Sequence, residues 1–313
     1  MAIERVSTNG LAQAMLAQVM RASNQLNDTQ SQIASGKIAN DYAGFGNKTS
    51  VMEAARAAKG RMEAYQASTQ LALNQTDLQN THVSSLGGLA DQLRQAMTKA
   101  VADGDSSTLM SEVQSIFDQA SQILNSRDSN GNYLYGGEKD NTPPLTATSL
   151  SNLAAMPAVS NAFANGTQKK TIMVGDGESV QVGVLASDVG TDLMQMLKDI
   201  ATFDAGPSGN FSGSTVITSA QSNFLSGALP QVISAASNLN TAAATNGYAY
   251  NRLEDALDRQ TTMGTMYEGF VGDLESVDMG EAVTKLNQNQ VALQAALQIA
   301  SQMNQLSLLN FMK

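Results

Sequence analysis

The sequence predicts a mainly α-helical protein, with long antiparallel helical arms and a small β-containing insert between them. Only five of the 313 residues are proline and only 15% are charged, a composition that permits long, weakly charged helices. Apolar residues recur at helical spacing near both ends of the chain, whereas turn residues gather in the middle. We therefore expect the N- and C-terminal helices to pair antiparallel, in a coiled-coil-like manner, with both termini at one pole.

The N-terminal segment carries the clearest coiled-coil pattern. Its stripe keeps alternating spacings of three and four residues, at Ala12, Met15, Val19, Ala22, Leu26, Thr29 and Ile33. Gly36 is expected to end this helix, and the glycine-rich residues 39–47 form a link to the next one. Periodicity alone leaves an ordinary amphipathic bundle helix equally open. The N-terminal half of the predicted assembly interface comprises Met15, Val19, Ala22, Leu26 and Ile33.

Two further helices are expected before residue 127. The first runs from Thr49 to Ala102, with a seam at Val51, Ala55, Ala58, Met62, Tyr65, Thr69, Ala72, Leu78, Leu86, Leu89, Leu93 and Ala96. After a turn at residues 103–107, a shorter helix is expected to direct inward Leu109, Val113, Ile116, Ala120 and Ile123.

Turn-rich sequence begins at Arg127. Turn residues flank the aromatic segment 133–135, which predicts a hairpin strand there. Residues 170–184 alternate around a Gly-Asp-Gly turn and predict a second hairpin, and residues 193–203 predict a short helix. The middle of the chain is therefore expected to be a small region of mixed character.

Helix resumes near Ser219, and Asp278 is expected to cap a separate C-terminal helix. From Leu286 to Met312 there is no charge; 15 of these 27 residues are apolar, and the other 12 are Asn, Gln or Ser. A lone helix of this kind lacks charge pairs and tertiary partners, so we expect it to order when many copies pack together. The C-terminal half of the predicted assembly interface comprises Leu293, Leu297, Ala300, Met303 and Leu306.

These segments predict three layers. Residues 1–40 and 279–313 are expected to form an inner assembly core of terminal helices. Residues 41–139 and 216–278 are expected to form a long helical shell with a hairpin, and residues 140–215 an outer insert domain.

Residues that could carry chemistry are scarce. The chain has no cysteine, which excludes a cysteine metal site, and its one histidine, His82, cannot form a histidine-rich zinc site. We expect His82 to be an ordinary helix-surface or core residue. Segment 128–138 misplaces the glycine and glutamate of a calcium loop, and segment 175–179 lacks the pattern of a phosphate or dinucleotide loop. We therefore expect no enzymatic activity, no cofactor and no metal.

Charge and hydropathy narrow the partners further. The net charge is −10 without a basic patch, which argues against nucleic acid. The amide-rich tail is too polar for membrane insertion. The first 15 residues lack the basic region and apolar run of a cleaved secretory signal, so export would need another route.

Both ends of the chain resemble the flagellin superfamily. The first similar stretch is LNDTQSQIASGKIANDYAG (26–44), which contains a Ser-Gly-Lys turn. The second is EAVTKLNQNQVALQAALQIASQMNQLSLLNFMK (281–313), which contains a Leu-Ser-Leu-Leu motif near its end. Within the superfamily, YLYGGEKDNTPPL (133–145) resembles the type 3 hook-associated proteins of the hook–filament junction. KIANDYAGFG (37–46) replaces a run that many filament flagellins carry there, which favours the junction type.

The resemblance implies a structural subunit of the bacterial flagellum, extracellular and exported through the flagellar type III apparatus without a cleaved signal peptide. Its terminal helices would assemble around the export channel. The implied partners are copies of itself, the neighbouring flagellar subunits (another hook-associated protein and flagellin), and an export chaperone at the C-terminal helix. The main alternative is a filament-forming flagellin with a short central domain. A second alternative is an enzyme or glycan-binding surface protein whose site lies in residues 140–215, but catalytic residue types are missing there and aromatic residues are few. A third, a generic coiled-coil secreted effector, does not explain the matching ends.

Overall fold

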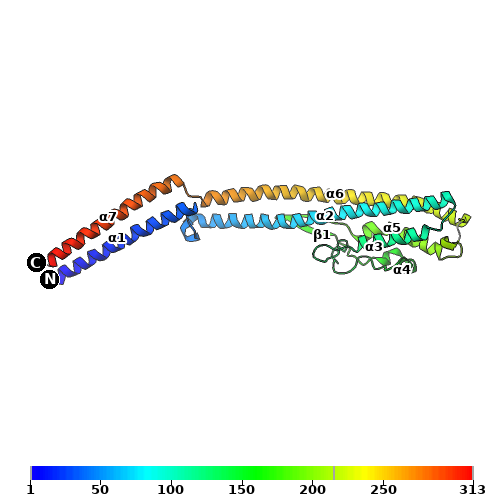
Figure 1. Ribbon diagram of the computed structural model, residues 1–313, viewed down its shortest axis with the longest axis horizontal. Coiled ribbons are helices and arrows are strands. Elements are labelled where there is room, and N and C mark those ends of the chain that lie inside the picture. Colours follow the sequence, from blue (N-terminus) through cyan, green and yellow to red (C-terminus); the bar gives the residue numbers. More distant parts are fainter. Residues whose placement is uncertain (1, 214–215, 312–313) are drawn as a thin grey trace. The chain divides into compact units, whose positions relative to one another are not determined.

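The computed structural model describes residues 2–213 and 216–311, and helices dominate it (Figure 1). Side chains are described for residues 10, 13–211, 213 and 216–302. The elements in chain order are α1 (Ala2–Ser35), η1 (Tyr42–Lys48), α2 (Thr49–Asp103), α3 (Leu109–Leu124), α4 (Leu150–Ala155), η2 (Val159–Ala162), β1 (Lys170–Gly175), β2 (Glu178–Val182), α5 (Ala186–Asp204), η3 (Phe211–Gly213), α6 (Ser219–Glu275) and α7 (Met279–Phe311).

The chain divides into two compact units. The terminal unit comprises Met1–Gly60 and Gly264–Lys313, and the central unit comprises Arg61–Met263. Each unit contains part of α2 and part of α6. The layer boundaries expected after residues 40 and 278 lie inside the terminal unit.

In the terminal unit, α1 and α7 lie side by side (Figure 1). Helix α1 ends at the predicted place because Gly36 adopts a φ of +69°, which favours glycine, while its N–H donates to the Gln32 carbonyl at 2.8 Å. Helix α7 begins after the predicted cap: Asp278 Oδ1 accepts from the N–H groups of Gly280 at 2.8 Å and Glu281 at 3.1 Å. Both helix boundaries thus follow from local sequence.

In the central unit, α2 and α6 pack antiparallel. The Asn246 amide donates to the Thr76 carbonyl at 2.9 Å, and Gln260 donates to Thr69 Oγ1 at 3.0 Å. The seam of α2 there is more polar than expected, because the buried residues after Ala72 include Thr76 and Gln79, whereas the predicted Leu78 is 39% exposed. In the terminal unit the α2 seam begins at the fully buried Met52, and the predicted Val51 is 46% exposed.

Residues 140–215 share one hydrophobic core with the helices around them. That core takes Leu93 from α2, Phe117 from α3, Leu153 from α4, Leu193 from α5 and Leu225 from α6, all of them buried. The segment expected to be an outer insert therefore covers apolar faces of α2, α3 and α6. In the central unit it forms a third layer over the helix pair.

One of the two expected hairpins is present. Strands β1 and β2 pair antiparallel around Asp176 and Gly177, where the sequence predicts the turn. The strand expected at residues 133–135 is not formed; the backbone there makes an isolated bridge between Arg127 and Tyr133, and Tyr135 is completely buried. Burial of the aromatic ring in the core overrides the alternating pattern.

Candidate assembly interface

Helix α1 directs its predicted interface residues toward α7; we call these two helices the terminal arm. Met15, Val19, Leu26 and Ile33 are half-buried and Ala22 is buried, whereas most other described side chains of α1 are exposed. Since α7 is the helix packed on α1, these five residues form the α1 side of a seam inside the monomer.

Helix α7 meets α1 through one stripe with spacings of three and four residues. Its members are buried or half-buried, and the residues between them are exposed: Ala282, Leu286, Asn289, Leu293, Ala296 and Ala300. Asn289 is the polar member, and its Nδ2 donates to Thr29 Oγ1 at 2.9 Å and to the Gln25 carbonyl at 3.1 Å. A hydrogen-bonded asparagine in an otherwise apolar seam specifies the register of paired helices.

Leu297 lies outside the seam that contains Leu293 and Ala300. Its side chain is 51% exposed, whereas those two are half-buried. Consecutive residues on a helix are rotated by about 100°, so the side chain of Leu297 points in a different direction from that of the seam residue Ala296. The predicted Ala12, Met303 and Leu306 lie outside the described side chains.

Large apolar side chains are exposed on both helices of the terminal arm. The described ones, with exposed fractions from 44% to 64%, are Leu16, Met20, Met279, Val283, Val291, Leu297 and Ile299. Many exposed apolar groups on one element indicate a surface that another molecule covers. Sequence reasoning identified only Leu297 among them, because it followed one stripe per helix; the four-residue spacing of Leu16 and Met20 was the available signal.

The terminal arm is tied to α2 and α6 at two short links, one after α1 and one before α7. The links are paired through their backbones: Ile38 N–H donates to the Glu275 carbonyl at 2.7 Å, and Val277 N–H donates to the Gly36 carbonyl at 3.0 Å. We call this paired region the joint. It holds together chain segments that are more than 230 residues apart.

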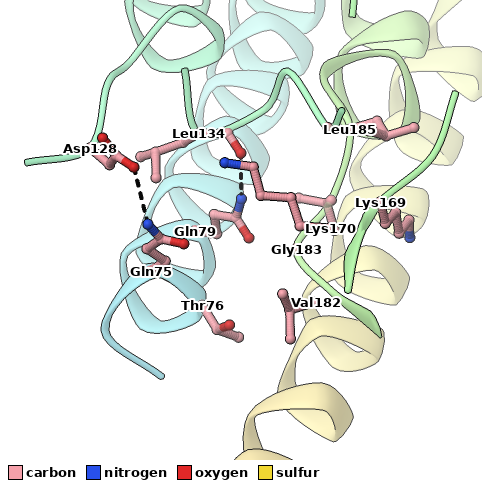
Figure 2. A pocket seen from close by; sticks show the side chains of 12 residues that line it. Gln75, Thr76, Gln79, Asp128, Leu134, Lys169, Lys170, Val182, Gly183 and Leu185 are labelled. Atoms are coloured by element: carbon pink, nitrogen blue, oxygen red, sulfur yellow. Dashed lines mark hydrogen bonds between the residues drawn. The ribbon is translucent and has the colours of Figure 1, made fainter. Parts of the chain in front are cut away.

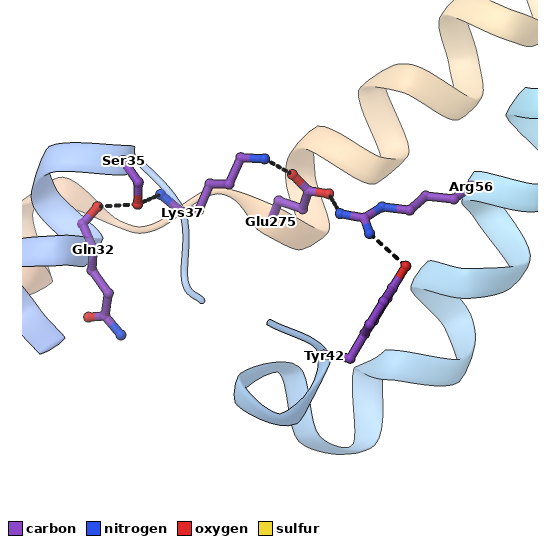
Figure 3. A network of polar contacts seen from close by, with 6 residues as sticks. All are labelled: Gln32, Ser35, Lys37, Tyr42, Arg56 and Glu275. Carbon is purple, nitrogen blue, oxygen red and sulfur yellow. Dashed lines mark hydrogen bonds and ion pairs between the residues drawn. The ribbon is translucent and has the colours of Figure 1, made fainter. Parts of the chain in front are cut away.

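The Glu275 carboxylate gathers two cations at the joint (Figure 3). Its side chain is 11% exposed, lies 2.8 Å from Lys37 Nζ and also pairs with Arg56. Arg56 in turn donates to the Tyr42 hydroxyl at 3.0 Å. Hydrogen bonds from Lys37 and Arg56 favour the charged carboxylate and hold the pKa of Glu275 below its usual range, while the same contact raises the pKa of Arg56.

A small cavity lies in the central unit where α2 meets the loop before α4 and strand β2 (Figure 2). Gln79 donates to the Leu134 carbonyl at 2.7 Å there, and Gln75 donates to Asp128 at 3.1 Å. The cavity volume of about 20 Å³ is close to that of one water molecule, so it cannot hold an organic cofactor.

A second, open depression lies between α5 and α6. Its volume is about 510 Å³, and Phe203 and Phe224, stacked with their ring centres 4.1 Å apart, help to line it. Asp199 is the titratable side chain among its described lining residues, and it accepts from Gln195 at 2.7 Å.

The single histidine is part of the central core rather than of a ligand site. His82 is half-buried, its Nδ1 lies 3.3 Å from Ser126 Oγ, and its ring stacks on Tyr135 at 6.2 Å between centres. Burial lowers the pKa of His82. Across the described residues, no group of three acidic, histidine or cysteine side chains could hold a metal ion, and no helix is long and apolar enough to cross a membrane.

Two family comparisons match the two ends of the chain. The bacterial flagellin N-terminal helical region matches residues 6–140, and the bacterial flagellin C-terminal helical region matches residues 229–312. The two matches include most of α1, all of α2, most of α6 and all of α7. No curated protein matches the chain in sequence.

Two solved structures share the fold. A protein described as a flagellar hook-associated protein from Vibrio parahaemolyticus matches with a TM-score of 0.57 at 17% identity, over 75% of this chain and 98% of that chain. Bacillus cereus FlgL matches with a TM-score of 0.52 at 14% identity, over 70% of this chain and 98% of that chain. At these identities the likeness establishes the shared fold.

Proposed function

The chain belongs to the bacterial flagellin family, and from this premise we propose that it is the junction subunit that adapts the flagellar hook to the filament. Flagellins and hook-associated proteins are structural, so the chain is not an enzyme. The junction role is supported by the segment 133–145, which resembles the type 3 hook-associated proteins. It is also supported by the two structures that share the fold, one described as a flagellar hook-associated protein and the other as FlgL.

The exposed apolar surface of the terminal arm carries the proposal that the chain assembles through its ends. Full burial of a leucine, valine or methionine side chain contributes roughly 1.5–3 kcal/mol, so covering a half-exposed one contributes roughly 1 kcal/mol. Seven such residues on one arm supply a driving force that the isolated chain does not use. We propose that residues 1–40 and 279–313 form the inner assembly core, where neighbouring copies cover this surface.

Within that core, the ten predicted interface residues divide into two roles. The seam residues, Leu293 and Ala300 among them, pair the two helices of one subunit, whereas Leu297 contacts a neighbouring copy. The absence of charge between Leu286 and Met312 supports this arrangement, because equivalent charges on packed copies would repel and lose hydration. Met303 and Leu306 are proposed to continue the same interface.

Neighbouring flagellar subunits are the further partners in this proposal. The subunit would contact another hook-associated protein on one side and flagellin on the other. The flagellar type III apparatus would export it, and a chaperone would cover the apolar C-terminal helix beforehand. A bound chaperone would protect the same exposed residues that later meet other copies.

A filament-forming flagellin is the second candidate, because both family matches are to flagellin regions. Deletion of the gene distinguishes the two. Loss of the junction subunit is expected to leave hooks intact and flagellin shed into the medium, whereas loss of the filament subunit removes flagellin from every fraction. Immunogold labelling provides the independent check: a junction subunit is labelled only at the tip of the hook, and label along the filament would contradict the junction role.

A further inference from the structure

We infer that Glu275 is a lock on the joint. While its carboxylate holds both Lys37 and Arg56, the two links stay side by side, and release of the carboxylate frees the terminal arm to swing about them. Glu275 therefore acts as a positioning residue for the arm. The inference goes beyond the proposed function because it concerns a conformational device inside one chain.

The position of Glu275 suits it to this role. It is the last residue of α6, Lys37 follows the end of α1 by two residues, and Arg56 lies in the second turn of α2. One carboxylate thus binds the link after α1 and the start of α2, while the backbone carbonyl of the same residue accepts from Ile38. No other described carboxylate of the terminal unit has ion pairs to two cations.

The exposures of the three groups make the lock reversible. Glu275 is 11% exposed and needs its cations, since an unpaired buried carboxylate is strongly disfavoured. The side chains of Lys37 and Arg56 are 50% and 39% exposed, so both cations can be hydrated when their ion pairs with Glu275 break. The stabilisation therefore depends on one buried anion, and neutralising that anion weakens the joint.

Little else described at the joint holds the two links together. Between the links themselves there are two backbone hydrogen bonds, and both hydrophobic core clusters consist of central-unit residues. The arm keeps its own contacts, including the bond from Asn289 to Thr29, so it would move as an intact helix pair. A swinging arm would let identical chains meet neighbours of different geometry, a consequence that rests on the proposed function.

Hydrogen exchange on the monomer tests the lock without any assembly. Glu275→Gln keeps the size of the side chain and removes its charge. We expect the Ile38 and Val277 amides to exchange roughly tenfold faster in this variant, the factor that corresponds to losing one charge-assisted hydrogen-bond contact. Unchanged rates in Glu275→Gln, or amides already unprotected in the wild-type monomer, would overturn the inference.

A matched control lies on the same helix. Glu268→Gln removes an exposed carboxylate that pairs with Lys59 at 3.3 Å, and it should leave the Ile38 and Val277 amides within about twofold of wild type. Lys37→Gln serves as the second variant, because a half-exposed side chain can be changed without risk to the fold; it should accelerate the same amides. Equal effects of Glu268→Gln and Glu275→Gln would show a general charge effect and no lock.

Discussion

Apolar side chains of the central unit are packed in hydrophobic core clusters, whereas many large apolar side chains of the terminal unit are exposed. Both hydrophobic core clusters of the described residues belong to the central unit, where α4 and α5 cover apolar faces of α2, α3 and α6. Among the side chains that the structure describes, 11 of the 18 exposed large apolar ones belong to the terminal unit, although it holds only about a third of the chain. Two helices can bury one stripe each against the other, and the remaining faces need another molecule.

This difference supports the proposal that the central unit folds independently, whereas the terminal arm is completed by contacts with neighbouring copies. The central unit has the layers that an independent domain requires. The terminal arm has a register-specifying contact between Asn289 and Thr29 and a seam rich in alanine, but its described residues form no second layer. The following predictions measure the difference, from the largest expected effect to the smallest.

The same substitution should have very different effects in the two units. Leu193→Ala in the central core should lower the free energy of unfolding by about 2–5 kcal/mol, because the residue is 1% exposed and leaves a cavity. Leu297→Ala on the arm should change it by less than about 0.5 kcal/mol. Urea unfolding of both monomers, followed by circular dichroism, measures the two values. Similar losses would mean that the arm is part of an ordinary globular core.

A charge on the arm should affect assembly and spare the monomer. Leu297→Asp places a carboxylate on the surface where we propose that copies pack, at a cost on the order of a few kcal/mol per subunit. We expect the melting temperature of the monomer to stay unchanged and incorporation into flagella to be lost. Gln298→Glu, an exposed neighbour, should have a milder effect. An unfolded Leu297→Asp monomer would contradict the assembly role of this surface.

The seam of the arm should depend on its polar contact. Asn289→Ala removes two donated hydrogen bonds to α1 and should destabilise the helix pair by about 1 kcal/mol. Faster hydrogen exchange along α1, with no change in the central unit, is the expected signature. Gln288→Ala, at an exposed neighbouring position, is the control and should leave α1 unaffected. If both variants behave alike, Asn289 has no special part in the pairing.

Acidification should weaken the two units in separate pH windows. The pKa of His82 is lowered by burial, so the unfolded chain takes up the proton first, and the stability of the central unit should fall as the pH drops below 6.5. The pKa of Glu275 is lowered by Lys37 and Arg56, so its contribution is complete above pH 4.5 and is lost as the pH falls further. Hydrogen exchange at several pH values separates the two steps.

Two variants assign these steps. His82→Gln should remove the step below pH 6.5 and leave the lower one, whereas Glu275→Gln should do the reverse. Both changes in stability should be small, because His82 is only half-buried and Glu275 forms only two ion pairs. A single transition shared by both units in wild type and in both variants would argue that they unfold as one body.

Local sequence by itself determined where the main elements begin and end. Gly36 ends α1 because its backbone conformation favours glycine, Asp278 caps α7 through its own side chain, and Gly177 provides the turn between β1 and β2. The family resemblance and the mainly α-helical class followed from the same local signals. These rules act within a few residues, so they can be recognised without knowing what else is nearby.

Only the tertiary structure decided which faces are covered. Val51 and Leu78 match an apolar stripe yet are exposed, because burial depends on which element lies above a residue and not on its spacing. Tyr135 is completely buried in the core instead of lying in the predicted strand, because neighbouring elements cover its ring. Lys37 and Glu275 are far apart in sequence, and their ion pair exists only because the fold brings two links together. Contacts of this range have no local signature, and the joint and the exposed surface of the terminal arm both depend on them.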